Sequence, residues 1–437
     1  MKFFKFALLS ILFWACQSQL LDPKFNESTP NYNLVFNNSS LDEISISVTP
    51  NDWQALESNL SQVLKTDSIA TDKLDSKLLV VPALVRFKDG VWNNVGLKFY
   101  TSKNLLDGYR FGLYQLPLEL DFDYFGSKFP EMVNQNFHGF SNLILDNQAN
   151  DNTKIRQVVF NSMLQDLDII TTKNSLKKVK ISIGNQNQIM LYTLKEKVEP
   201  VIIKNQFNET KFNLYRTNSK LDKFKINDFN RLEAGYLPGF GDVQRLINSV
   251  NRRNSIFNQT FDPISGLPNE SAWKLSLDNA FDNQMYIRWL ALNTTIGNDQ
   301  FNLVYQEPYY FFSGSNTKAN FFYTFPQNSL GLGFDSSISI PEILNSVEPN
   351  PLLANIIKDP SYFNEFQIEL ILLRKKFFAT AYLYPLIDKY YNQIRLASMG
   401  NNLSDSPQIQ DIDLLKLWIK QRIETLDKSS NEMSIIQ

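Results

Sequence analysis

The sequence predicts an α+β protein with a strand-rich N-terminal lobe and a helix-rich C-terminal lobe. Three observations predict this class. The chain has 437 residues, of which 43% are hydrophobic and 13% aromatic, so it can bury a large core. Up to about residue 203, many apolar residues alternate with polar ones, which is the period of a strand. From about residue 227, the apolar residues recur with the period of a helix. A cleft between two such lobes is the default place for a ligand.

The N-terminal lobe is predicted to span residues 41–225. We expect strands at residues 43–48, 79–87, 91–100, 116–122, 141–145, 179–183 and 190–194. A turn at Lys88-Asp89-Gly90 makes the second and third of these a hairpin, and Gly184-Asn185 joins the last two. Apolar residues at helical spacing predict a helix over residues 151–167, with an N-cap between Asp151 and Thr153.

Three sets of polar residues in this lobe have simple structural interpretations. Lys177, Lys178 and Lys180 are expected to protect the edge of a sheet, with membrane or phosphate contact as the weaker alternative. Asp121 and Asp123 are expected to share one face of a strand end. His138 lies in an apolar stretch and is expected to be structural, although any His-dependent triad would have to use it because the chain has no other histidine.

The C-terminal lobe is predicted to span residues 226–345, followed by C-terminal helices of the same domain over 346–437. Helices are expected at residues 241–251, 278–296, 360–394 and 411–426, the third broken at Pro385. Gly297 has the position of a C-cap glycine. A strand pair is expected at 302–305 and 320–324, and Trp273, Trp289 and Trp418 are expected in the core.

Composition excludes several classes of function. The 43 Lys and Arg residues nearly balance the 45 Asp and Glu residues, so no bulk charge favours nucleic acid as a partner. One cysteine and one histidine exclude an internal disulfide and a Cys/His zinc cluster within the chain. Any metal site must therefore use oxygen ligands, which suit Mg²⁺, Mn²⁺ or Ca²⁺.

Residues 1–16, MKFFKFALLSILFWAC, have the pattern of a signal peptide. Lys2 and Lys5 precede a short apolar segment, and the segment ends at Cys16. A small residue followed by cysteine is how a bacterial lipoprotein signal ends, which predicts an exported protein anchored to the cell envelope by a lipid on Cys16. The alternative is a plain secretory signal. Residues 17–40 are polar and are expected to form a surface tether.

Seven segments in order carry a resemblance to a known family. They are residues 81–100 (VPALVRFKDGVWNNVGLKFY), 116–125 (LPLELDFDYF), 137–145 (FHGFSNLIL) with 151–156, 190–199 (MLYTLKEKVE), 213–216 (NLYR), 297–305 and 322–333. Together they resemble the CotH-type kinases. The resemblance implies a divergent protein-kinase-like fold of two lobes. It also implies transfer of phosphate from ATP, with Mg²⁺ or Mn²⁺, to Ser or Thr of an extracytoplasmic or coat protein.

The resemblance also implies roles for particular residues. Asp299 would orient or deprotonate the acceptor hydroxyl, and Glu196 would be the buried acid beside a nucleotide-binding cation. Gln115 and Arg216 stand at further nucleotide-binding positions. Asn302 would be a helper or a metal ligand, Asn328 stands at a metal-ligand position, and Asp335, a few residues further on, is the candidate substitute ligand.

Several departures from the family pattern fall on these chemical positions. No glycine follows the second hairpin strand, and the uncharged Gln115 stands where the family has lysine. Gln157 replaces a glutamate, and Asn328 and Leu330 replace two aspartates, which weakens any metal site. The pattern predicts equally well an inactive relative that acts as a structural or binding component of the surface. A third alternative is an unrelated surface lipoprotein of adhesive or substrate-binding type.

Overall fold

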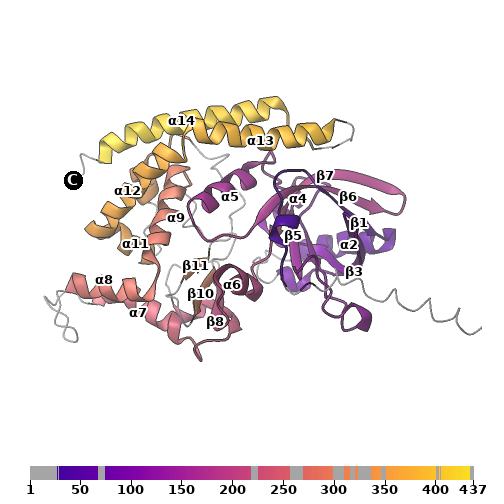
Figure 1. The fold of residues 1–437 in the computed structure, drawn as a ribbon, viewed down its shortest axis with the longest axis horizontal. Helices are drawn as coiled ribbons and strands as arrows, with labels where there is room; N and C mark the ends of the chain where they lie inside the picture. Colours follow the sequence, from indigo (N-terminus) through magenta and orange to yellow (C-terminus); the bar gives the residue numbers. More distant parts are fainter. Residues whose placement is uncertain are drawn as a thin grey trace, which may run out of the picture.

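The computed structural model describes residues 27, 29–66, 74–217, 225–255, 269–298, 310–314, 320–322, 336–345, 351–399, 403 and 405–433. As the sequence predicts, strands dominate the first part of the chain and helices the second. The strands of the first part form a barrel on one side of the molecule, and the later helices lie on the other side (Figure 1).

Seven strands form the barrel, in the order β1-β2-β3-β4-β5-β7-β6. They are β1 (Glu43–Val48), β2 (Val81–Phe87), β3 (Gly90–Phe99), β4 (Leu118–Asp121), β5 (Asn142–Asp146), β6 (Asn174–Ile183) and β7 (Gln186–Glu196). The parallel pairing of β1 with β6 closes the ring, while the other neighbours are antiparallel. The sequence predicts the strands but not this closure, because the two closing strands are far apart in the chain.

The barrel interior is a dense aromatic and aliphatic core. Trp92 is fully buried against Phe122 and Phe137, and its indole Nε1 donates to the carbonyl of Asn136. His138 packs edge-on against Trp92 with its Nδ1 3.1 Å from a carboxylate oxygen of Glu27, which agrees with a structural role.

The prediction of a tether fails for residues 29–40. They contain α1 (Tyr32–Val35), and both Val35 and Phe36 are buried in the barrel core. Helix α2 (Pro50–Thr66) was also not predicted. It buries Leu56, Leu60 and Val63 in the same core. The few apolar residues in these segments stand among polar ones and give no clear periodic signal, so only the tertiary structure shows that they are buried.

The predicted edge of Lys177, Lys178 and Lys180 does not exist, because β6 lies between β1 and β7. Lys177 shares the inward face with Val179 and is fully buried, with its Nζ 3.5 Å from a carboxylate oxygen of Asp42. Burial lowers the pKa of Lys177 to about 8, although Asp42 opposes this shift. Lys178 lies on the outer face and pairs with Glu43 at 2.9 Å.

A second sheet follows the barrel, in the order β11-β10-β8-β9. It consists of β8 (Phe212–Thr217), β9 (Phe229–Ala234), β10 (Tyr310–Gly314) and β11 (Asn320–Phe322). Helix α6 (Pro200–Phe207) buries Ile202 and Ile203 against Phe212, Leu214 and Phe312 of this sheet. Of the predicted strand pair, the second strand is β11, while residues 302–305 lie outside the described residues.

Helices make up most of the rest. They are α4 (Lys103–Arg110), α5 (Arg156–Asp166), α7 (Gly241–Ser255), α8 (Asn269–Ala280), α9 (Asn283–Thr295), α10 (Ile340–Asn345), α11 (Pro351–Lys358), α12 (Pro360–Lys376), α13 (Thr380–Ser398) and α14 (Ile409–Met433). Helices α13 and α14 lie side by side across one face, and α5 lies between the barrel and the other helices (Figure 1). Within the described ranges, no helix has both the length and the apolar character needed to span a membrane.

Two of the predicted helices are interrupted at other positions in the structure than the sequence predicts. Residues 278–296 divide between α8 and α9 because the Asp282 side chain accepts from the Met285 N–H and starts a new helix. The break in residues 360–394 comes after Lys376, and Pro385 lies inside α13. The predicted C-cap is confirmed: Gly297 has φ +73° directly after Ile296, the C-cap of α9. Trp273 and Trp289 are buried as predicted, while Trp418 is half-buried.

Candidate functional site

The outer face of the barrel next to α5 is strongly polar. Successive residues of a strand point to opposite sides, so inward Leu97, Leu120 and Leu194 leave their neighbours outside. Those neighbours are Lys98 of β3, Glu119 of β4 and Lys195 of β7, which the strand register aligns in one row through Ile144 of β5. Asp146 follows on β5. This row, with Asp146 and Lys197, is called the charged face below.

The centre of the charged face is an ion pair between Lys195 and Asp146. Their Nζ and Oδ2 atoms are 3.4 Å apart, and the residues are 5% and 0% exposed. Three N–H groups also donate to the Asp146 carboxylate: Asn104 Nδ2 at 2.7 Å, Gln157 Nε2 at 2.8 Å and the Gln148 main chain at 3.0 Å. Burial alone raises the pKa of Asp146, but Lys195 and these donors outweigh it and hold the pKa below its usual value.

A second ion cluster lies on the same face. Glu119 is buried between Lys98, at 3.3 Å, and Lys197, at 2.6 Å. Although burial lowers the pKa of a lysine, Glu119 holds the pKa of Lys197 above its usual value. Asp121 ends β4 beside this cluster and accepts from the Asp123 N–H at 3.2 Å, in keeping with the predicted strand end. The charged face therefore concentrates three lysines and two acids.

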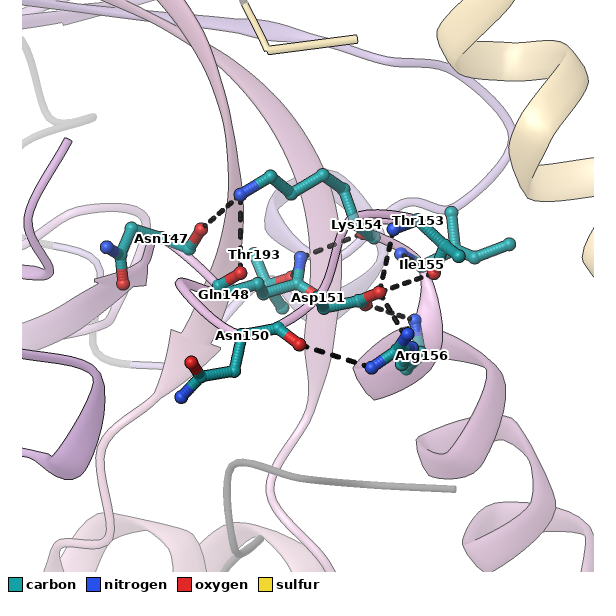
Figure 2. Close-up of polar contacts among 9 residues, drawn as sticks. All are labelled: Asn147, Gln148, Asn150, Asp151, Thr153, Lys154, Ile155, Arg156 and Thr193. Carbon is teal, nitrogen blue, oxygen red and sulfur yellow. Dashed lines mark hydrogen bonds and ion pairs between the residues drawn. The ribbon is translucent and has the colours of Figure 1, made fainter. Parts of the chain in front are cut away.

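A tightly bonded loop, residues 147–156, leads from β5 to α5 beside this face (Figure 2). Gln148 and Lys154 have φ of +48° and +56°, which costs non-glycine residues energy. Gln148 Nε2 compensates by donating to the Lys154 carbonyl at 2.8 Å and to Thr193 Oγ1 of β7 at 2.5 Å. The Lys154 ammonium donates to the Asn147 and Gln148 carbonyls at 2.9 and 3.2 Å. The loop is thus fixed to the barrel.

Asp151 organises the loop, but not as the predicted N-cap. Helix α5 begins at Arg156 after Ile155, which makes no side-chain cap. The Asp151 carboxylate accepts from the main-chain N–H groups of Thr153 at 2.8 Å and Arg156 at 3.0 Å, and lies 2.8 Å from Arg156 Nε (Figure 2). These contacts fix the start of α5, and with it the position of Gln157 beside Asp146.

Gln115 and Glu196 do not meet in one site. Gln115 Nε2 donates to the carbonyl of Leu191, whose N–H donates to Asp405 at 3.0 Å. Leu191 and Glu196 are five residues apart on β7, which is about 16 Å along a strand. The prediction that both belong to one nucleotide pocket is therefore not supported by their placement.

Glu196 also lies on the opposite face of β7 from Lys195. Its carboxylate accepts from the Tyr32 hydroxyl at 2.5 Å and from the Lys173 N–H at 3.1 Å. Burial raises the pKa of Glu196 to about 7, against the lowering effect of those donors. The predicted acid is buried, but the cation and acid that meet on the charged face are Lys195 and Asp146. Their signal in the sequence was weak: Lys195 lies in the matching segment 190–199, and Asp146 directly follows the matching segment 137–145.

The remaining predicted residues lie elsewhere. Arg216 is on β8, opposite Tyr310 of β10 and on the face that α6 covers. Asp299, Asn302, Asn328, Asp335 and Cys16 lie outside the described residues. Asn298 is described and buried, and its Nδ2 donates to Asn293 Oδ1 at 2.8 Å. Position 299 therefore follows an anchored helix end.

Arg422 of α14 provides a further anchor for that helix end. It is fully buried, and its Nε and Nη2 donate to the carbonyls of Thr295 and Thr294 at 2.9 and 2.8 Å. Its Nη1 donates to the Ile338 carbonyl. A Cβ atom at Gly297 would lie 3.1 Å from Arg422 Nε, so the glycine gives the guanidinium room as well as its φ of +73°. No sequence pattern pointed to Arg422.

The groups that the charged face offers to a ligand are lysines and amide oxygens. Among the described residues, no group of three Asp, Glu, His or Cys side chains is arranged to hold a metal ion. The charged face offers lysines that suit phosphate groups. Gln148 Oε1 and Gln157 Oε1 are buried there and accept no hydrogen bond from any described residue.

Comparison with known proteins identifies the family. The model described as CotH kinase protein matches residues 113–426, whereas no curated protein matches the chain. The match includes β4 to β7, the loop 147–156, the charged-face pair and Arg422, and it begins after the hairpin of residues 81–100. Since it covers most of the chain, the protein belongs to the CotH kinase family.

Proposed function

We propose that the protein is a phosphoryl transferase of kinase-like fold that uses ATP and modifies Ser or Thr hydroxyls of an extracytoplasmic protein. The observation that supports this proposal best is the Lys195–Asp146 pair, held by Gln157 of α5 on the charged face. Phosphoryl transfer depends mainly on positioning and on stabilising negative charge, so a lysine fixed by an acid is a central requirement.

The roles proposed for the chain's own residues are as follows. Asp146 orients Lys195, whose ammonium would neutralise charge on the phosphates, while Lys98 and Lys197 are paired with Glu119 on the same face. Asp299, directly after the end of α9 that Arg422 anchors, accepts the proton of the acceptor hydroxyl. ATP would supply the γ-phosphoryl group and leave as ADP, and Asn302, Asn328 and Asp335 would hold Mg²⁺ or Mn²⁺, which would neutralise charge on the phosphates.

The test is nucleotide binding and transfer by the purified protein. ATP with Mg²⁺ or Mn²⁺ is expected to raise the melting temperature, and γ-labelled ATP is expected to label Ser or Thr. Lys195→Ala should lose both effects, and Asp299→Ala should lose labelling but keep the thermal shift. Lys180→Ala, a barrel lysine on β6, is the matched control and should behave like wild type. Absence of both effects in the wild-type protein would overturn the proposal.

A specific residue favours a second candidate, an inactive relative that acts as a binding or structural component of the cell surface. Gln157 stands where the family pattern has a glutamate, so the α5 residue beside Asp146 carries no charge. With Asn328 and Leu330 replacing aspartates, such a chain would bind nucleotide weakly or not at all. Thermal shift without labelling, or neither, is the outcome expected of this candidate.

We also propose that Cys16 carries a lipid that anchors the protein to the bacterial cell envelope. The position of the only cysteine at the end of the apolar N-terminal segment supports this. Mass spectrometry of the protein from the native membrane should find an acylated Cys16 as the first residue. An unmodified mature protein in the medium would favour simple secretion.

A further inference from the structure

One connection of the barrel presents apolar side chains that the barrel core does not use. It covers residues 123–135, between β4 and β5, and is called the apolar loop below. Phe122, just before it, is buried in the barrel core, whereas Tyr124 and Val133 are each 49% exposed. The apolar side chains of the loop that lie outside the described barrel core are Tyr124, Phe125, Phe129, Met132 and Val133.

The rings of the apolar loop pack on one another. The ring centroids of Tyr124 and Phe125 are 4.8 Å apart, and those of Phe125 and Phe129 are 6.5 Å apart, both edge-on. The exposed Lys128 places its Nζ 5.6 Å from the centroid of the Phe129 ring. Aromatic rings beside a lysine are typical of the boundary between lipid and water, where rings lie among the headgroups and the ammonium reaches water.

The main chain of the apolar loop is bonded internally. The Phe129 N–H donates to the Phe125 carbonyl, and the Met132 N–H donates to the Phe129 carbonyl, both at 2.9 Å. Gln135 Nε2 donates to the Phe122 carbonyl at 2.9 Å and so fixes the end of the loop to the barrel. Paired main-chain groups cost less to take out of water, and a preformed loop loses little conformational entropy on binding.

The apolar loop lies next to the first described residue of the chain, Glu27. Asn136, directly after the loop, donates from Nδ2 to the Glu27 carbonyl at 3.1 Å, and His138 Nδ1 is 3.1 Å from the Glu27 carboxylate. Residues 17–26 separate Glu27 from Cys16, and a chain of that length reaches at most about 40 Å. A lipid on Cys16 would therefore hold the apolar loop close to the membrane.

We propose that the apolar loop inserts its exposed rings and Val133 into the interfacial layer of the membrane to which Cys16 is anchored. This inference rests on the lipid anchor proposed above and adds a second contact, which orients the barrel with this end toward the membrane.

The charges of the apolar loop indicate what drives this contact. The loop contains one lysine, Lys128, and two acids, Asp123 and Glu131, so it has no excess of positive charge for anionic headgroups. Asp123 Oδ1 accepts from the Asn134 N–H at 2.9 Å, within the loop. Burial of apolar area is therefore the driving force, and binding should depend little on salt.

The test places a nitrobenzoxadiazole fluorophore on the apolar loop of the lipidated protein, reconstituted in vesicles of phosphatidylethanolamine and phosphatidylglycerol. Val133→Cys carries the label. Leu113→Cys, which is 38% exposed in the connection before β4, carries the control label at the other end of that strand. The emission at position 133 is expected to shift to the blue and to be quenched by lipids with a nitroxide on the acyl chain, whereas emission at position 113 should do neither.

A second experiment separates the loop from the lipid. The mature chain from residue 17 onward contains every described residue but not Cys16, and it is mixed with the same vesicles. Tyr124→Ser is expected to weaken its binding about fivefold, because less apolar area is buried. Tyr114→Ser removes an 88% exposed tyrosine from the control connection and should bind like the parent. Unchanged melting temperatures would show that lost binding is not lost folding.

The outcomes distinguish the loop from the anchor. Emission at position 133 that does not respond to vesicles, or equal responses at positions 113 and 133, would overturn the proposal. A blue shift that appears without vesicles as protein concentration rises would show contact with a second copy and would also overturn it. Vesicle binding that depends on Tyr124, in a protein whose Cys16 carries no lipid, would refute only the anchor. An acylated Cys16 without insertion of the loop would refute only the loop.

Discussion

The barrel and the helical half of this protein bury cations in different surroundings. In the barrel, Lys195 faces Asp146 and Lys177 faces Asp42, so each ammonium is opposed by a carboxylate. In the helical half, Arg422 donates to main-chain carbonyls at the C-terminal end of α9 and to that of Ile338. The Thr294 and Thr295 carbonyls carry the negative end of the α9 dipole.

The difference indicates two kinds of role. A carboxylate–lysine pair can exchange part of its interaction for an incoming phosphate, because the ammonium keeps donors that can be shared. A guanidinium bonded to several carbonyls holds them in place, and its loss leaves the Thr295 carbonyl without this donor in a buried position. We therefore interpret Lys195 as a group that can contact a phosphate, and Arg422 as a positioning residue for the segment after α9.

Of the substitutions considered, removal of Arg422 should lower the free energy of unfolding most. Arg422→Met removes a donor from the carbonyls of Thr294, Thr295 and Ile338, of which Thr294 keeps the Gly297 N–H, and this loss is expected to lower the free energy of unfolding by about 5 kcal/mol. Urea denaturation followed by circular dichroism measures this. Lys420→Met, on the exposed side of the same helix, is the control and should change little. Equal costs for the two variants would contradict the positioning role.

Removal of Lys195 should cost less. Lys195→Met leaves a buried carboxylate that still accepts from Asn104, Gln148 and Gln157, so a loss of about 3 kcal/mol is expected. The double variant Lys195→Met with Asp146→Leu should recover part of this stability, because no uncompensated charge remains. A double variant less stable than the single one would show that the pair is not the main interaction of either residue.

The pH dependence of stability tests Glu196, a buried acid of the barrel for which burial outweighs the opposing charge of Lys173. Folding raises the pKa of Glu196 from about 4.5 to about 7, so the folded state binds more protons between these values. The stability contributed by Glu196 is therefore present below pH 4.5 and lost as pH rises through 7, by about 1–3 kcal/mol.

Glu196→Gln should flatten this part of the stability curve, measured by urea denaturation at several pH values. Glu424→Gln on α14 is the exposed control and should leave the curve unchanged. Glu199 is a second acid whose pKa burial raises to about 7, so some slope should remain in the Glu196 variant. A Glu196 variant with the wild-type slope would refute the assignment.

The smallest change in the free energy of unfolding is expected for a substitution on the outer surface of the barrel. Lys178 pairs with Glu43 at 2.9 Å, and both side chains retain access to solvent. Such pairs contribute little, so Lys178→Gln should change the free energy of unfolding by about 0.5 kcal/mol or less. Lys177→Gln, one residue earlier and buried, should cost several times more. Similar costs would show that burial does not separate the two lysines.

Much of the fold could be predicted from local patterns, and less of the site. The strands β2 and β3 and their turn follow from alternation and from Lys88-Asp89-Gly90, which are local signals. The charged face could not be predicted, because it depends on which side of β7 is covered. A shift of one residue exchanges Glu196 for Lys195, and only the register with β5 and β6 fixes that choice.

The sequence by itself determined the α+β class, the family, and the absence of any Cys/His metal cluster or internal disulfide, because these depend on composition, on periodicity and on ordered motifs. Tertiary structure decided that the strands close into a barrel, that Lys195 meets Asp146, and that Arg422 holds the end of α9. These contacts join residues far apart in the chain. Their geometry comes from strand register and helix packing, which no local pattern encodes.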